Sequence, residues 1–149
     1  ATEALAMLGD PSRARVMLVT LPEETPINEL VETAFSLEEE VGVMLGPVIL
    51  NGTWPPLPGL DTPLAEAARR ASVDLSAEER VSLASAGAYR TERSELQQEL
   101  TERLATELPL PHLDLDFVFT NELESDDLRT LADDLLRGIE ALDPNWAAL

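Results

Sequence analysis

Short apolar runs alternate along the chain with longer segments in which apolar residues recur every three or four positions. The runs at residues 16–21 and 47–50 contain β-branched residues without alternation, which is typical of strands buried on both faces of a parallel sheet. Between them, Thr25 and Pro26 predict the start of a helix and Gly42 predicts its end. Strand, helix and strand in this order predict a right-handed βαβ crossover. The apolar stripe of the helix is Ile27, Leu30, Val31, Ala34, Leu37 and Val41.

The middle of the chain is a loop followed by helical segments. Residues 51–63 hold four prolines and two glycines, and residues 63–70 predict a short helix. Ser76 and Glu79 have the spacing of a capping box, which opens a much longer helix. Gly87 predicts a break in that helix. Residues 63–108 as a whole are interpreted as a helical insertion. Its expected buried stripe is Leu96, Leu100, Leu104 and Leu108.

Residues 113–119 alternate apolar and other side chains and predict a third strand. Ser125 is the expected cap of a last helix, before a tail at residues 145–149. Doubly wound sheets have more than three strands, so we expect the remaining strands to precede residue 1, where residues 4–8 predict the tail of a helix and the chain start is a cut. The expected inner face of the last helix is Leu128, Leu131, Leu135, Ile139 and Leu142.

Composition excludes several classes of function. The chain has 29 acidic and 10 basic residues, a net charge of -19, and this charge disfavours nucleic acid and anionic membrane surfaces as partners. It contains no apolar run of about 18 residues and no signal peptide, so we expect no transmembrane segment and a cytoplasmic location. Without cysteine and with His112 alone, no zinc site is expected, and His112 is interpreted as structural or exposed.

The chain contains no lysine, and this bears on whether it can hydrolyse a nucleotide. A Walker A loop needs a lysine that reaches the β- and γ-phosphates, so this chain cannot hydrolyse a nucleotide by itself, and we assign it no catalytic residue. Binding chemistry is expected at the carboxyl ends of the strands, residues 22–25, 51–54 and 120–122. Asn51 offers a donor and an acceptor that match an adenine edge. Spacing alone favours the other interpretation, in which Asn51-Gly52 is a turn.

Two further groups of residues also leave alternatives open. Trp54, Leu57 and Leu60 form either a partner contact or, as we favour, a tryptophan packed on its own prolines. The pairs Arg69-Arg70 and Arg90-Arg93 either reach phosphate or, as we favour, are solvated helix positions paired with nearby glutamates.

The chain resembles a known family through three segments. VMLVTLPEETP at residues 16–26, residues 30–38, and GPVILNG at residues 46–52 look like the second half of the arsenite-pump and tail-anchored-protein-targeting ATPases, most of all the actinobacterial anion-transporting branch. LPLP at residues 108–111 and the segments after it also fit this pattern. The resemblance implies the C-terminal part of a parallel-sheet P-loop NTPase fold.

The resemblance also implies roles for residues. Asn51 would contact adenine, so with the resemblance a nucleotide contact is favoured over a simple turn at Asn51-Gly52. The loop after the last strand would cover the adenine base. Pro22 and Glu23 are weaker candidates near the nucleotide and the dimer interface. The zinc-binding Cys-x-x-Cys of the targeting members has no counterpart at residues 53–59, so no metal is expected here. The covering loop is Val118, Phe119, Thr120, Asn121 and Glu122.

Two functional hypotheses follow. In the first, the chain is the adenine-contacting half of an ATPase that couples ATP binding and hydrolysis to rearrangement of a homodimer or paralogue heterodimer. The missing N-terminal P-loop half would hold Mg²⁺ and the phosphates of ATP or ADP, and this chain alone would bind neither. In the second, the chain is a non-catalytic interaction module that pairs with a P-loop partner or a client.

Overall fold

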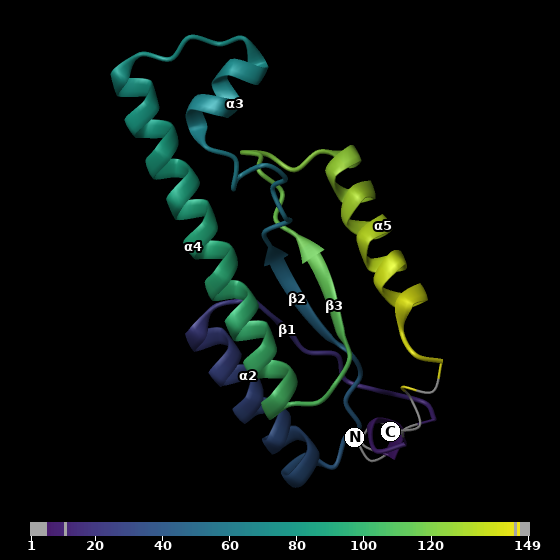
Figure 1. The fold of residues 1–149 in the computed structure, drawn as a ribbon. Coiled ribbons are helices and arrows are strands. Elements are labelled where there is room, and N and C mark those ends of the chain that lie inside the picture. Colours follow the sequence, from purple (N-terminus) through teal and green to yellow (C-terminus); the bar gives the residue numbers. More distant parts are fainter. Residues whose placement is uncertain (1–5, 11, 145, 147–149) are drawn as a thin grey trace.

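The computed structural model describes residues 6–10, 12–144 and 146 as a mixed α/β structure. Three parallel strands form one sheet in the order β1-β2-β3, and β2 lies at its centre (Figure 1). The strands are β1 (Val19–Thr20), β2 (Val48–Thr53) and β3 (His112–Asp116). The predicted α/β class and the parallel βαβ crossover are confirmed.

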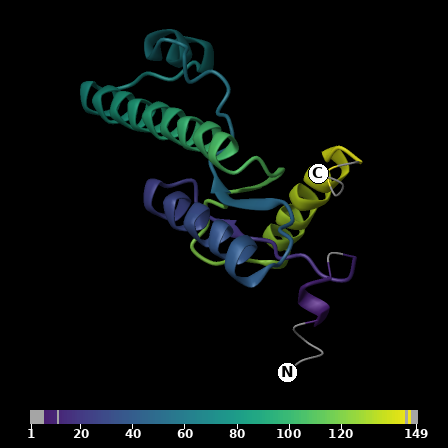
Figure 2. The ribbon, with the colours of Figure 1, turned by 90° about the horizontal axis from the view of Figure 1, so that it is seen from below.

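Helices lie on both sides of this sheet. Viewed from below, α2 and α4 lie on one side of the strands and α5 lies on the other (Figure 2). α3 packs beside the first half of α4, beyond the ends of the strands (Figure 1). The helical elements are α2 (Glu24–Ser36), the π-helical turn η1 (Leu37–Val41), α3 (Leu64–Ala71), α4 (Ala77–Glu107) and α5 (Ser125–Ala141).

The hydrophobic core fills the space between the sheet and the helices α2 and α4. Its residues come from the two helices, from the strand β2 and from the segments beside it, so the βαβ unit and the long helix share one core. This burial is the main favourable term in the folding of the chain. The buried members are Ile27, Leu30, Ala34, Leu45, Val48, Leu50, Leu100, Leu104 and Leu108.

The strand boundaries differ from those predicted. β1 is shorter than residues 16–21, although an isolated bridge between Val16 and Leu45 continues its direction. β2 extends beyond Leu50 to Thr53. β3 ends at Asp116 rather than residue 119, because its partner strand ends at Thr53 and is soon followed by prolines, which have no N–H to donate.

The helix α2 begins two residues earlier than predicted. Glu23, not Thr25, is the N-cap, and its carbonyl accepts the first helical bond from the Ile27 N–H at 3.0 Å. The end is predicted correctly: Gly42 lies in the left-handed region with φ 73° and donates its N–H to Leu37. The wider π-helical turn rotates Val41 off the apolar stripe, which leaves it 57% exposed.

The helix α4 is continuous, so the predicted break at Gly87 is wrong. The capping box is confirmed, since Ser76 Oγ accepts from the Glu79 N–H and the Glu79 carboxylate accepts from the Ser76 N–H. Leu96 was expected in the buried stripe but is 45% exposed. The buried position at this level is its neighbour Gln97, and the apolar stripe starts only at Leu100.

The helix α5 differs from prediction at its cap and on its inner face. Its N-cap is Glu124 rather than Ser125, because the Asp127 carboxylate accepts the Glu124 N–H at 2.9 Å. Leu128 and Ile139 remain largely exposed. The helix approaches the sheet closely at Gly138, where a Cβ atom would lie 3.1 Å from the Leu113 side chain.

Part of the predicted ends lies outside the described residues. Residues 6–8 are helical, while the rest of the expected helix end at residues 4–8 is not described, and of the tail at residues 145–149 only Trp146 is. Within the described ranges, no helix has the length and apolar character needed to span a bilayer.

We predict that Leu104→Ala lowers the free energy of unfolding by about 2–5 kcal/mol, because it opens a cavity at a fully buried position of the core. Urea denaturation measures this change. Leu96→Ala, two turns earlier on the same helix, serves as the matched control and should cost about 1 kcal/mol or less. Equal losses for the two variants would contradict the placement of the core.

Candidate functional site at the carboxyl edge of the sheet

The carboxyl ends of the three strands form the edge where ligands bind in open α/β sheets. Asn51 lies near the end of β2, the central strand, and pairs in register with Leu115 of β3. Its neighbour Gly52 has φ +77°, and the pairing is irregular between Asn51 and Thr53. The Asn51-Gly52 dipeptide is therefore a bulge inside the strand, and the interpretation as a simple turn is wrong.

The side chain of Asn51 is exposed and available. It borders a hollow of about 450 Å³ together with residues of the β1 edge and of α2, among them Thr20, Leu21 and Pro26. No described residue forms a hydrogen bond with its amide group. Both the donor and the acceptor of this amide can thus serve a ligand.

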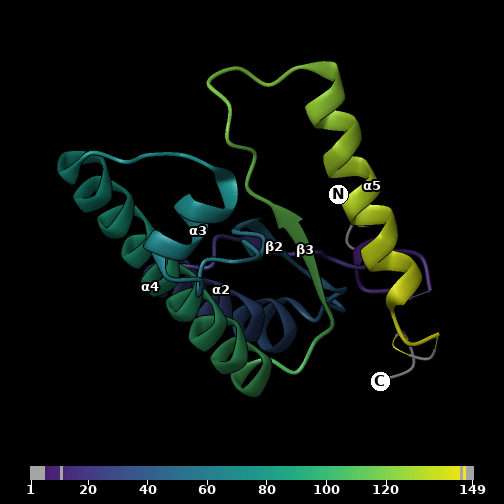
Figure 3. The same ribbon diagram turned by 45° about the horizontal axis from the view of Figure 1, so that its top comes forward.

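The loop after β3 runs away from the sheet towards α5 (Figure 3). Phe117 and Phe119 are in contact, with ring centroids 4.8 Å apart in an edge-to-face arrangement. Thr120 Oγ1 donates to the Glu122 carbonyl at 2.9 Å, which closes a tight turn. Phe119, Thr120 and Asn121 border a second hollow of about 540 Å³, whereas Val118 is half-buried.

An aromatic cluster fixes this loop to the segment after β2. The ring of Trp54 lies 5.4 Å from Phe119, 6.2 Å from Phe117 and 5.9 Å from Tyr89 of α4. Arg90 places its guanidinium 4.5 Å from the centre of the Trp54 ring. Trp54 therefore packs on rings and on a cation, so the prediction that it packs only on its own prolines missed the main contacts.

The weaker candidates lie beside this cluster. Pro22 is buried and Glu23 accepts from Arg93 at 2.7 Å. Arg93 is paired with a glutamate, as predicted, but its side chain is only 25% exposed, and Arg90 is also half-buried, so neither is a solvated position. The interpretation holds for Arg70, which pairs with Glu66 on the exposed face of α3.

Gln97 joins α4 to the end of β2. Its side-chain oxygen accepts the Trp54 N–H at 2.9 Å, and its side-chain nitrogen donates to the Gly52 carbonyl at 3.5 Å. Gln97 is buried, so these backbone groups depend on it in place of water. The role of Gln97 was not predicted from the sequence, although a glutamine on the helix face that carries Leu100 and Leu104 indicates a buried polar contact.

These residues lie along one edge of the sheet without forming one shared pocket. Asn51 and the loop at residues 118–122 lie along the same edge, but they border separate hollows, and Glu23 is engaged by Arg93. The described edge offers an amide, backbone groups and aromatic rings. At the strand ends, Thr53 Oγ1 donates to the Leu115 carbonyl at 3.1 Å and lies 3.4 Å from Asp116 Oδ1.

His112 lies away from this edge, at the start of β3. It borders a hollow with Asp114, Asp116 and Asp134, and Arg137 donates a hydrogen bond to Asp134. Burial lowers the pKa of His112, which the charge of Asp114 opposes, and partial desolvation raises the pKa of Asp114. No group of three or more histidine or acidic side chains among the described residues is placed to hold a metal ion.

Comparison of the sequence with protein-family models and with curated protein sequences finds no match.

We predict that Gln97→Leu lowers the free energy of unfolding by about 1–3 kcal/mol, because the Trp54 N–H loses its acceptor in a part-buried position. Urea denaturation and the near-ultraviolet circular dichroism of the aromatic cluster report the effect. Gln98→Leu, at the adjacent exposed position, is the control and should leave the aromatic signal unchanged. An unchanged signal in Gln97→Leu as well would show that Gln97 does not hold this segment.

We also predict a pH dependence from His112. Its pKa is lower in the folded than in the unfolded chain, so the unfolded state binds the proton first and stability falls as the pH drops through about 6.5. His112→Gln should therefore lose less stability than the parent chain between pH 8 and pH 6, as measured by urea midpoints. The raised pKa of Asp114 acts with the opposite sign and in a more acid range. A steeper loss in the variant would refute this assignment.

Proposed function

We propose that this chain is the base-contacting half of a nucleotide-dependent ATPase of the kind formed by the arsenite-pump and tail-anchored-protein-targeting ATPases. The observation that carries the proposal is Asn51, whose unpartnered amide stands near the carboxyl end of the central strand. Parallel strand order and the bulge at Gly52 support it, because they present this amide at the edge where α/β sheets bind ligands.

The loop after β3 supports the same proposal. Phe119, Thr120 and Asn121 extend beyond the sheet along the same edge as Asn51, as residues that cover a base must. The residues are held by the contact of Phe117 and Phe119 with Trp54, so the loop has a defined position before any ligand arrives. Preorganisation of this kind lowers the entropic cost of binding.

In this proposal, the phosphates of ATP are bound by a different part of the protein. The chain has no lysine and no Walker A loop, so Mg²⁺ and the phosphates of ATP would be held by an N-terminal P-loop half. This chain would contribute the base contact and part of the helical region, and the complete protein would act as a dimer.

A second candidate function, a non-catalytic interaction module, is favoured by the uncovered side of the sheet. β1 is an edge strand, and Met17, Val19 and Leu21 along it are 43–60% exposed. Leu128 and Ile139 of α5 are exposed as well. Such apolar surface suits a tightly bound partner, which is either the P-loop half of the first proposal or a separate protein.

We predict that Mg-ADP binds to a polypeptide extended through the upstream coding sequence but not to this chain alone. Isothermal titration calorimetry tests both. In the extended protein, Asn51→Ala should weaken binding by about tenfold, because a base loses one or two hydrogen bonds. Asn28→Ala, which removes an exposed amide on α2, is the matched control and should bind normally.

Either of two results would reject the ATPase proposal. One is the absence of Mg-ADP binding in the extended protein, which would leave the interaction module. The other is equal binding by the Asn51→Ala and Asn28→Ala variants, which would place the base away from this edge.

A further inference from the structure

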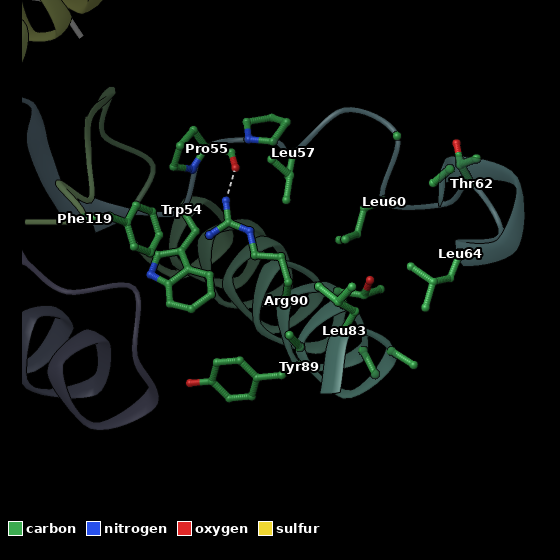
Figure 4. Close-up of a pocket in the computed structure, with 18 residues that line it drawn as sticks. Trp54, Pro55, Leu57, Leu60, Thr62, Leu64, Leu83, Tyr89, Arg90 and Phe119 are labelled. Carbon is green, nitrogen blue, oxygen red and sulfur yellow. Dashed lines mark hydrogen bonds between the residues drawn. The ribbon is translucent and has the colours of Figure 1, made fainter. Parts of the chain in front are cut away.

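An apolar pocket lies apart from the hollow beside Asn51, between the proline-rich loop after β2, the helix α3 and the first half of α4 (Figure 4). Its volume is about 920 Å³, within the range of small-molecule sites. Small residues on the α4 side keep it open: Ala84 and Gly87 line the wall, and Leu60 stands across from Gly87. The apolar side chains on its walls include Leu57, Leu60, Leu64, Ala67 and Leu83.

Several large side chains that line the pocket are exposed to water, which is unfavourable for apolar groups. Leu57 is 57% exposed, Leu83 46% and Tyr89 60%. The chain carries 29 acidic residues, yet none of them lines this pocket. An apolar surface of this kind gains free energy when an apolar ligand displaces the water that covers it.

One end of the pocket carries a positive charge. The guanidinium of Arg90 lies over Trp54 and 5.4 Å from the ring centre of Phe119, and it donates one hydrogen bond to the Pro55 carbonyl (Figure 4). Its neighbour Arg93 is neutralised by Glu23 at 2.7 Å. Arg90 has no such partner: among the described residues no carboxylate lies within salt-bridge distance of it, and its buried Nε has no acceptor.

This arrangement is unusual in a chain with a net charge of -19, in which six other arginines form ion pairs with acidic side chains. A part-buried cation without a counter-ion is costly, and an anion that reaches it recovers a charge-assisted hydrogen bond. The pocket thus pairs an apolar wall with one uncompensated positive charge at its end.

We propose that this pocket binds a small amphiphile with a single anionic head group and an aliphatic tail. The head group accepts hydrogen bonds from Arg90 beside Trp54. The tail lies along Leu57, Leu60 and Leu83, towards α3. Such a ligand satisfies both features at once, whereas a neutral apolar molecule leaves the charge of Arg90 unpaired.

Decanoate and 1-decanol separate the two contributions, since they share a tail and differ in the charge of the head group. We expect both to change the fluorescence of Trp54, measured in a Trp146→Phe background below the micelle concentration. Decanoate should bind at one site and about tenfold more tightly than decanol, the difference expected for a hydrogen bond to a charged group.

Variants test each part of the pocket. Arg90→Gln should reduce decanoate binding to the level of decanol, whereas Arg70→Gln, which removes an equal charge from the exposed face of α3, should not. Ala84→Phe fills the pocket from an exposed helix position and should weaken both ligands about tenfold or more. Circular dichroism checks that each variant is folded, and Arg90→Lys keeps the charge if Arg90→Gln does not fold.

The proposal is overturned if decanoate and decanol bind equally well to the parent chain, or if Ala84→Phe leaves decanoate binding unchanged. Binding at many sites without saturation, or capture of an amphipathic peptide with no response to decanoate, would also overturn it. None of these variants replaces Asn51 or a residue of the loop at 118–122, so a failure here leaves the nucleotide proposal standing.

Discussion

A parallel sheet needs a cover on both of its faces, and the two faces of this sheet are covered unequally. On one face, α2 and α4 bring Ile27, Leu100 and Leu104 against β2, and the core is closed. On the other face, α5 packs mainly on β3, through the close approach of Gly138 to Leu113. Apolar residues of β1 and α5 are left exposed, which supports the proposal that a partner covers this side.

The carboxyl edge of the sheet depends on the covered face. Gln97 occupies the position on α4 just before the apolar stripe begins, and it holds the backbone of Gly52 and Trp54. Trp54 in turn positions Phe117 and Phe119, so the loop after β3 is ordered through a contact that starts in the core. The bulge that presents Asn51 and the end of the apolar pocket therefore share one support.

The spacing of apolar residues predicted the fold correctly for the elements with one continuous buried run or stripe. The runs around β1 and β2 and the stripe of α2 gave the βαβ unit, and Ser76 with Glu79 marked the start of α4. The predictions were wrong where a single local interaction determines which of two neighbouring residues is the cap or is buried. Asp127 selects Glu124 over Ser125 as a cap, and a π-helical turn moves Val41 out of the core, because both depend on backbone geometry that composition does not report.

The candidate site was predictable only in part for a similar reason. Asn51 stands out because a polar residue follows a buried run, so the sequence alone located it near the end of β2. Arg90, Arg93 and Gln97 were interpreted wrongly or missed, because their contacts are with Pro55, Glu23 and Gly52, which lie 35 to 70 residues away in the chain. Contacts over such separations leave no periodic pattern.

The continuity of α4 through Gly87 has a mechanical consequence. Thirty-one residues without a break make a rod about 46 Å long, anchored to the sheet near one end by Leu100 and Leu104. A rod held in this way acts as a lever. A tilt of about 5° at the anchor displaces its far end by roughly 3–4 Å, estimated from the helical rise. Small adjustments beneath the strands are thus magnified at the opposite tip of the molecule.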